Sequence, residues 1–338
     1  MDQVVSTNHP WSKWHDRLHR QLLRDPKLLP NGKTLLLAVS GGQDSMAMVG
    51  LLLDLQPLHN WQLQIWHGNH GWHQHSATIS SELQAWCCTR KIPFSVDVAE
   101  QNSVQSEAAA RHWRYSQLTE HVLNHCKGQN DQPCEHVLTG HTCSDRAETL
   151  LLNLARGTDL KGLSSLPRQR RLAKGVAVVR PMLNFSRAET LQICKALKLP
   201  IWLDPTNQNL EFSRNRVRHE VIPVLEALHP GCSLRMAELC ERLGNYQTTQ
   251  DSLASVALTC LIQNNQLDRQ QISQVPLPGR IALMAKWIHL NGVPRITSKQ
   301  LHELSQAIAA HQPPGTRDLA NGWKIIWERK SVQLVHYG

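Results

Sequence analysis

Short apolar runs alternate with longer helix-like stretches through the first half of the chain. Four such pairs follow one another, at residues 34–39 and 44–55, 63–67 and 75–91, 94–98 and 106–125, and 136–140 and 145–156. This rhythm predicts an α/β fold, in which a parallel sheet carries helices on both faces. The ligand of such a sheet lies beyond the carboxyl ends of its strands.

The alternation stops at about residue 217, where the pattern becomes helical. A chain of 338 residues has room for two domains. We expect an N-terminal helix and the α/β domain at residues 1–222. Residues 223–338 would then form a linker helix and a smaller, mainly helical C-terminal domain. Two late strand-like runs, 323–328 and 331–336, give that domain some α+β character.

The charge of the chain is basic. Its 36 Lys and Arg residues against 27 Asp and Glu residues leave +9, with a sequence pI near 9.2. This balance favours a polyanionic partner such as nucleic acid. No secretory signal or membrane-length apolar run is visible, so we expect a cytoplasmic protein with no membrane partner. None of the nine cysteines forms a Cys-x-x-Cys pair, which disfavours a zinc or iron–sulfur site.

A glycine-rich loop joins the first predicted strand to the next helix. The apolar run 35–39 leads directly into Ser40, Gly41, Gly42, Gln43, Asp44 and Ser45. Paired glycines let backbone N–H groups and a helix N-terminus converge on an anion, and the serines add hydroxyl donors. The loop therefore predicts a phosphate cradle.

Asp44 distinguishes this loop from the common nucleotide-binding loops. The Gly-Lys-Ser/Thr of a Walker loop and the three-glycine spacing of a dinucleotide fold are both absent from it. A carboxylate beside phosphates needs a cation between them, so we interpret Asp44 as a Mg²⁺ ligand. The alternative is a plain turn in which Asp44 and Ser45 cap the helix.

The loop resembles that of the PP-loop, or N-type ATP pyrophosphatase, superfamily, whose members cleave ATP between the α and β phosphates. The resemblance implies an adenine nucleotide alpha hydrolase-like, Rossmann-like domain, an adenylated substrate and released pyrophosphate. Further motifs follow in a fixed order, at His67–Gly71, Glu107–Arg111 with Tyr115, Gly140–Thr149, Arg180–Leu183, Ser186–Arg187, Asp204–Asn207 and Ser213–Arg218. Together they resemble the tRNA(Ile)-lysidine synthetase family.

That family adenylates carbon-2 of the wobble cytidine in the CAU anticodon of tRNA(Ile), and free L-lysine then displaces AMP. Lysidine pairs with adenosine, so codon reading changes from AUG to AUA. The resemblance implies the same carbon–nitrogen ligase reaction here, with ATP as co-substrate and tRNA(Ile) and L-lysine as partners. Whether the chain forms a homodimer stays open.

The resemblance also assigns His141 and Asp145 to the active site, with Asp145 joining Asp44 as a candidate Mg²⁺ ligand. Both residues come at or just beyond the carboxyl end of a predicted strand, where an α/β sheet binds its ligand. As an alternative, Asp145 only caps the following helix. Ser144 departs from the family pattern, which usually has two acidic residues at this point, so no second carboxylate is supplied there.

Two arginines are candidate contacts to the substrate. Arg111 follows Glu107 by four residues, so a surface ion pair on one helical face is the alternative. Arg214 belongs to a cluster with Arg216 and Arg218, which is either a solvated helix face or a clamp on the adenylate or the tRNA backbone. The resemblance favours Arg111 and Arg214 as groups that stabilise the activated base.

The resemblance places His67 and His70 in the nucleotide pocket. Together with His73 and His75 they match no common zinc spacing. In the C-terminal domain, basic side chains suit contacts to the tRNA backbone without base readout. These residues are Arg280, Lys286, Arg295, Lys299, Arg317, Lys324, Arg329 and Lys330.

Two rival functions remain. A PP-loop tRNA thiolase would share the loop and the RNA substrate, but it needs reactive cysteines, and Cys87 and Cys88 have no evident neighbours that would stabilise a thiolate. A non-catalytic RNA-binding protein is the rival from another class. Such a protein would not need Asp44 beside a phosphate cradle.

Overall fold

The protein, here a computed structural model, is described at residues 9–71, 76–100, 106–124, 126, 133–202, 209–294 and 296–337. The chain forms two compact units, Met1–Gly244 and Asn245–Gly338. Among the described helices, none combines the length and the apolar character that a membrane span requires.

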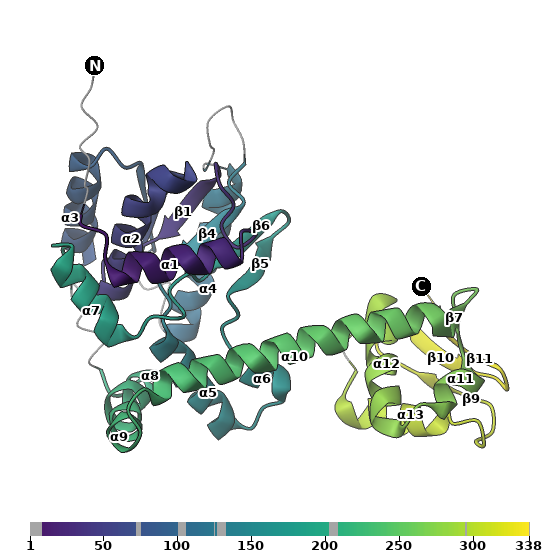
Figure 1. The fold of residues 1–338 in the computed structure, drawn as a ribbon. Coiled ribbons are helices and arrows are strands. Elements are labelled where there is room, and N and C mark those ends of the chain that lie inside the picture. Colours follow the sequence, from purple (N-terminus) through teal and green to yellow (C-terminus); the bar gives the residue numbers. More distant parts are fainter. Residues whose placement is uncertain are drawn as a thin grey trace. The chain divides into compact units, whose positions relative to one another are not determined.

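A six-stranded sheet organises the first unit (Figure 1). Its strands lie in the order β3-β2-β1-β4-β6-β5, and neighbours pair in parallel except for β5 and β6. The strands are β1 (Thr34–Ala38), β2 (Gln62–Asn69), β3 (Phe94–Val98), β4 (His136–Thr139), β5 (Gln169–Ala173) and β6 (Val176–Val179). The predicted α/β fold with a mostly parallel sheet is therefore confirmed.

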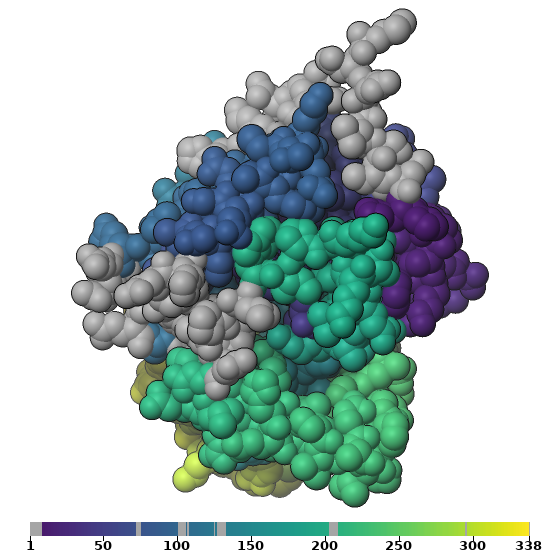
Figure 2. All heavy atoms as spheres, turned by 90° about the vertical axis from the view of Figure 1, so that its left-hand side faces the viewer, coloured from purple at the N-terminus to yellow at the C-terminus, as the bar shows by residue number. Residues whose placement is uncertain are grey.

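Helices cover both faces of this sheet, as the alternation of side chains along β1 requires. Leu35 and Leu37 are buried in a core with α1, α2, α3 and α7, whereas Leu36 belongs to a second core with α4. Figure 2 shows α7 between α3 and α1 on one face of the unit. The helices are α1 (Lys13–Arg24), α2 (Gln43–His59), α3 (Ser76–Thr89), α4 (Glu107–Asn124), α5 (Cys143–Arg156), α6 (Leu160–Leu163) and α7 (Arg187–Ala196).

Strand β5 was not predicted. Its sequence, Gln-Arg-Arg-Leu-Ala, lacks the apolar run of the central strands because it lies at the sheet edge and is only partly buried. The strands predicted at 34–39, 63–67, 94–98 and 136–140 correspond to β1, β2, β3 and β4. The helix predicted after each of them corresponds to α2, α3, α4 and α5, with ends that differ by a few residues.

The first unit extends beyond the boundary expected at residue 222. Four helical segments follow α7, namely α8 (Ser213–Arg216), a π-helical turn (Val217–Val221), α9 (Ile222–Leu228) and α10 (Cys232–Leu261). The start of α10 is held by Arg146, whose buried guanidinium donates to the carbonyl of Ala237 at 3.0 Å and lies 3.5 Å from Glu241. These contacts join α10 to α5, so the division between the units falls within α10, at Gly244.

The second unit contains a five-stranded antiparallel sheet in the order β7-β8-β11-β10-β9. Two of its strands, β10 (Trp323–Trp327) and β11 (Ser331–His336), were predicted; the other three were not, because each is four residues or shorter: β7 (Ile262–Gln263), β8 (Gln266–Asp268) and β9 (Gly315–Asp318). The core contains Leu267, Trp287, Leu304 and Ile325. Its helices are α11 (Arg269–Gln274), α12 (Leu277–Leu290) and α13 (Ser298–Ala307).

Candidate active site

A pocket of about 370 Å³ lies at the carboxyl ends of β1, β2 and β4. Strand order reverses between β1 and β4, because the chain moves from β1 outward to β3 before it returns to the other side of β1. Such a switch point is where an open α/β sheet binds its ligand. The pocket lining includes Ser40, Asp44, His67, His70 and Arg111 and, from later in the chain, His141, Asp145, Arg187, Arg214 and Arg218.

The loop after β1 is bent so that the N-terminus of α2 faces the pocket. Gly41 has φ +86°, a backbone conformation that favours glycine, and a Cβ there would lie 3.2 Å from the ring of Trp202. Ser45 Oγ donates to the carbonyl of Gly42 at 2.9 Å and lies 3.3 Å from Ser40 Oγ. Gly42 is the N-cap and provides no side-chain cap, so first-turn N–H groups of α2 can meet an anion.

The side chains of Gln43 and Asp44 are engaged with α7. The amide of Gln43 donates to the carbonyl of Arg187 at 2.6 Å and to Thr190 Oγ1 at 3.0 Å. The carboxylate of Asp44 accepts from Arg187 at 2.9 Å and from the hydroxyl of Thr190. Asp44 therefore does not act as the helix cap that was the alternative interpretation.

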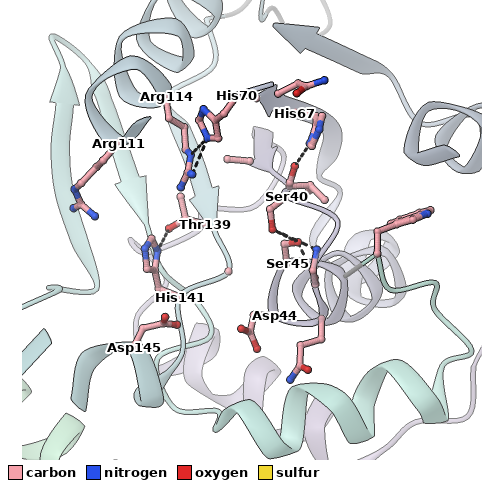
Figure 3. Close-up of a pocket in the computed structure, with 18 of the residues that line it drawn as sticks. Ser40, Asp44, Ser45, His67, His70, Arg111, Arg114, Thr139, His141 and Asp145 are labelled. Atoms are coloured by element: carbon pink, nitrogen blue, oxygen red, sulfur yellow. Dashed lines mark hydrogen bonds between the residues drawn. The ribbon is translucent and has the colours of Figure 1, made fainter. Parts of the chain in front are cut away.

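Burial and the nearby carboxylate of Asp145 together raise the pKa of Asp44 to about 6, against the opposing effect of Arg187. The two acidic groups face the same pocket from the starts of α2 and α5 (Figure 3). A cation between them would remove the repulsion that raises the pKa.

Gly140 lets the end of β4 approach the glycine-rich loop closely. A Cβ at this position would lie 2.8 Å from the Cα and N atoms of Ser45. Because those are backbone atoms, no side-chain rotation could relieve the clash. This contact holds the two loops that carry Asp44 and His141 next to each other.

Asp145 caps α5, as the alternative interpretation expected, and it also lines the pocket. One oxygen accepts from the backbone N–H and the hydroxyl of Thr142, each at 2.8 Å, which completes a capping box at the start of α5. The other oxygen accepts from Arg214 at 2.9 Å. Burial alone would raise the pKa of Asp145, but Arg214 and Arg218 outweigh it and hold this pKa below its usual range.

His141 lies beside Asp145, with Nδ1 2.9 Å from the hydroxyl of Thr139. Burial and the arginines around the pocket together lower its pKa to about 3, against the opposing effect of Asp145. The imidazole is therefore neutral at pH 7. A group with so low a pKa is poorly matched to general-base chemistry at neutral pH, so His141 suits hydrogen bonding to a substrate better.

Glu148 pairs with two arginines at the floor of this cluster. It is 1% exposed and accepts from Arg214 at 2.8 Å and from Arg218 at 2.7 Å. Glu148 and Arg187 belong to two of the sequence motifs, but no role was predicted for either residue. The capping box of Ser186 and Glu189 was a usable signal for Arg187, because it fixes the first turn of α7.

The opposite wall of the pocket carries the remaining candidates. His67 is buried, and its Nδ1 lies 2.7 Å from the carbonyl of Val39. His70 is bonded to Arg114 at 2.8 Å, and Arg111 stacks on the ring of Tyr115. The side chain of Glu107, and residues 73, 75 and 204–207, lie outside the part of the chain that the structure describes.

Two expectations about single residues are resolved by their contacts. Ser144 accepts from the backbone N–H of Arg187 at 3.2 Å, so this position joins α5 to α7. Arg280 was expected at a tRNA surface, and that prediction was wrong. Its guanidinium is buried and donates to the carbonyls of Ser273 and Ser305, which makes it part of the second unit's interior.

The family described as a PP-loop domain matches residues 14–225. A tRNA(Ile)-lysidine synthase of Prochlorococcus marinus is 45% identical over 336 residues, which cover 99% of this chain and 100% of the relative. That of Parasynechococcus marenigrum is 48% identical over 96% of this chain and 95% of its own length. The chain belongs to the tRNA(Ile)-lysidine synthase family. The resemblance inferred from the ordered motifs is thus confirmed.

A solved structure gives a more distant comparison. The U34-tRNA thiolase NcsA from Methanococcus maripaludis superposes with a TM-score of 0.57 at 21% identity, covering 68% of this chain and 78% of the thiolase. At this identity the likeness concerns the fold alone. It agrees with the PP-loop architecture seen in the first unit.

Proposed function

We propose that the chain ligates L-lysine to carbon-2 of the wobble cytidine of CAU-anticodon tRNA(Ile), through an adenylated tRNA and with release of pyrophosphate and AMP. The product would read AUA in place of AUG. One observation carries the proposal: similarity to curated tRNA(Ile)-lysidine synthases runs over nearly the whole of both chains, across the pocket and the second unit alike.

The nucleotide would be ATP, held by Ser40–Ser45 with its phosphates toward the N-terminus of α2. The uncapped first turn of that helix and the serine hydroxyls supply donors for phosphate oxygens. The stacking of Trp202 against Gly41 closes one side of the loop.

A Mg²⁺ ion fits the pocket next to this loop. Asp44 and Asp145 are the residues that would hold it, because both carboxylates line the pocket. When bound, the ion would neutralise phosphate charge during cleavage of ATP. The described residues contain no cluster of three or more metal-ligating side chains, so phosphate and water oxygens would complete the coordination.

Arg214 and Arg218 would stabilise negative charge on the adenylate. Both guanidiniums are fixed by Glu148, and both also contact Asp145, which lines the pocket. An incoming anion could therefore replace Asp145 as their partner without leaving Glu148 unpaired. His141, neutral at pH 7, would donate or accept a hydrogen bond at the reacting base.

The second unit would dock tRNA through its surface charge, as proposed for residues 223–338. Lys299, Arg329 and Lys330 are exposed and form no ion pair with any described residue. A homodimer would be consistent with apolar side chains left exposed on α9 and the start of α10, at Val224, Leu228, Leu234 and Leu239. Sedimentation velocity at several concentrations tests the dimer.

Sulfur transfer has less support as a rival. Burial raises the pKa of Cys87, Cys143 and Cys194 to about 12 in each case. Two of these thiols lie near the pocket, where Cys194 donates to the carbonyl of Gln43. A thiol with so high a pKa is protonated at pH 7 and is a poor nucleophile.

Purified protein incubated with ATP, Mg²⁺ and CAU-anticodon tRNA(Ile) tests the proposal. Labelled lysine should enter the tRNA, with one pyrophosphate released per lysine incorporated. Omitting ATP and replacing tRNA(Ile) with elongator tRNA(Met) are the controls, and both should leave the label in free lysine. Incorporation of labelled sulfur in place of lysine would overturn the lysidine assignment.

A further inference from the structure

Two arginines lie over one tyrosine ring beside the pocket. The guanidinium of Arg170, on edge strand β5, is 4.4 Å from the ring centroid of Tyr115, and that of Arg111, on α4, is 5.3 Å from it. Burial opposes ionisation of Tyr115, yet Arg170, Arg180 and Arg111 together lower its pKa. Three positive side chains thus gather around one phenol.

Among the side chains that the structure describes, these arginines have no carboxylate partner of the kind that Arg214 and Arg218 have. Within the described part of the chain, Arg111 makes no hydrogen bond or ion pair, and Arg170 contacts only Tyr115 and, at 3.5 Å, the carbonyl of Arg171. Arg180 is 1% exposed, and its Nε has no partner among the described atoms. Such a concentration of positive charge attracts an anion.

The position of the cluster separates it from the ATP phosphates. Arg111 and Tyr115 line the pocket, whereas Arg170 lies outside the lining. Figure 3 shows Arg111 on the far side of His141 from Ser40 and Ser45. An anion bound between Arg111 and Arg170 would therefore sit at the rim of the pocket and away from the glycine-rich loop.

We propose that Arg111, Tyr115 and Arg170 form a subsite for a backbone phosphate of the RNA, next to the nucleotide that enters the pocket. Stacking on the ring holds each planar guanidinium in place, which lowers the entropy lost when its N–H groups bind phosphate oxygens. The inference rests on the proposed function for the identity of the RNA. The subsite itself requires only that a polynucleotide approaches the pocket from this side.

The neighbouring residue Arg171 provides a matched control. It follows Arg170 on β5 and therefore points to the other face of the strand. Its side chain is exposed and donates to the carbonyl of Ala173 at 3.3 Å. Removing Arg171 changes the net charge equally but leaves the Tyr115 cluster intact.

Binding of CAU-anticodon tRNA(Ile) at several salt concentrations tests the subsite with R170M, R111M and R171M. R170M and R111M should each weaken binding about 5- to 10-fold and lower the slope of log K against log salt by about one. R171M should change affinity less than about twofold, and the KM for ATP should stay unchanged in R170M. Arg170 and Arg111 lie on different elements, β5 and α4. A similar loss of tRNA affinity in R170M and R111M would therefore exclude local misfolding of a single element as its cause.

Equal losses in R170M and R171M would overturn the subsite, since overall charge would then explain both. A raised KM for ATP with unchanged tRNA affinity would also overturn it and assign the anion to the nucleotide. These outcomes are independent of the proposed function, which fails if the wild-type protein binds tRNA(Ile) but transfers no lysine to it.

Discussion

The arginines beside the pocket and a buried arginine of the second unit serve different purposes. In the first unit, Arg214 and Arg218 are paired with the carboxylates Asp145 and Glu148, and all four groups lie at or beneath the pocket. In the second unit, Arg269 donates four hydrogen bonds, and every acceptor is a backbone carbonyl. In the first arrangement a bound anion could take the place of a carboxylate partner, whereas in the second the arginine joins separate segments of the backbone.

The second arrangement follows from the geometry of α13. That helix ends at Ala307, and Arg269 donates to the carbonyls of Ile308 at 2.9 Å and Ala309 at 2.8 Å, just past its C-terminus. Carbonyls at this end have no helical partner and carry the negative end of the helix dipole. A buried cation there satisfies the carbonyls and is itself stabilised by them.

Replacing Arg269 with Met should give the largest change in stability. Four carbonyls, two of them buried, would lose their donor, so we expect the second unit to be destabilised by about 3–5 kcal/mol. Urea-dependent hydrogen exchange of residues 245–338 in the full chain measures this, while ATP binding to the first unit should be retained. Arg329→Met, at an exposed position, is the control; equal destabilisation in both variants would contradict the role given to Arg269.

Replacing Asp44 with Asn should have the opposite effect and raise the free energy of unfolding. Its pKa is raised to about 6 in the folded state, so ionised Asp44 destabilises the ligand-free protein. A shift of about two units from the ordinary value corresponds to about 3 kcal/mol as an upper limit. Asn reproduces the neutral state, so Asp44→Asn should be more stable at pH 7.5 by up to this amount while losing pyrophosphate release.

The pH dependence distinguishes this explanation from a packing effect. Below about pH 4, Asp44 is protonated in both folded and unfolded states and the variant gains nothing. As the pH rises to about 6, only the unfolded state releases its proton, so wild-type stability falls relative to the variant; above pH 6 the difference is constant. Denaturation curves from pH 4 to 8 check this, with exposed Asp16→Asn as control. A gain that is the same at every pH would contradict it.

The parts of the fold that depend on local periodicity could be predicted from the sequence. The run Leu35–Val39, the glycine pair and the alternation around it were enough to place β1, its loop and the parallel sheet. Because the carboxyl ends of parallel strands meet at one edge, Asp44 and His141 could be expected in one pocket although they are far apart in the chain.

What the sequence could not supply was the partner of each charged side chain. Arg214 and Arg280 are the same residue type, yet Arg214 contacts the carboxylate of Asp145 whereas Arg280 contacts backbone carbonyls within the second unit. The pairing of Glu148 with Arg214 likewise depends on a tertiary contact, in which the chain near residue 214 packs against α5. The edge strand β5 was missed for the related reason that its polar pattern is compatible with a strand only when β6 lies beside it.

The smallest effect is expected for exposed cations of the second unit. Lys299 and Lys330 have no ion-pair partner among the described residues, so they can bind phosphates without first breaking an ion pair. Replacing both with Gln should weaken tRNA binding about fivefold, or about 1 kcal/mol, and lower the salt slope by nearly two. Lys324 pairs with Asp318 at 3.2 Å, so Lys324→Gln should cost less than either single change. Filter binding of tRNA(Ile) between about 50 and 200 mM salt measures these values. An unchanged slope in the double variant would exclude Lys299 and Lys330 from the RNA interface and leave the pocket arginines as the main phosphate contacts.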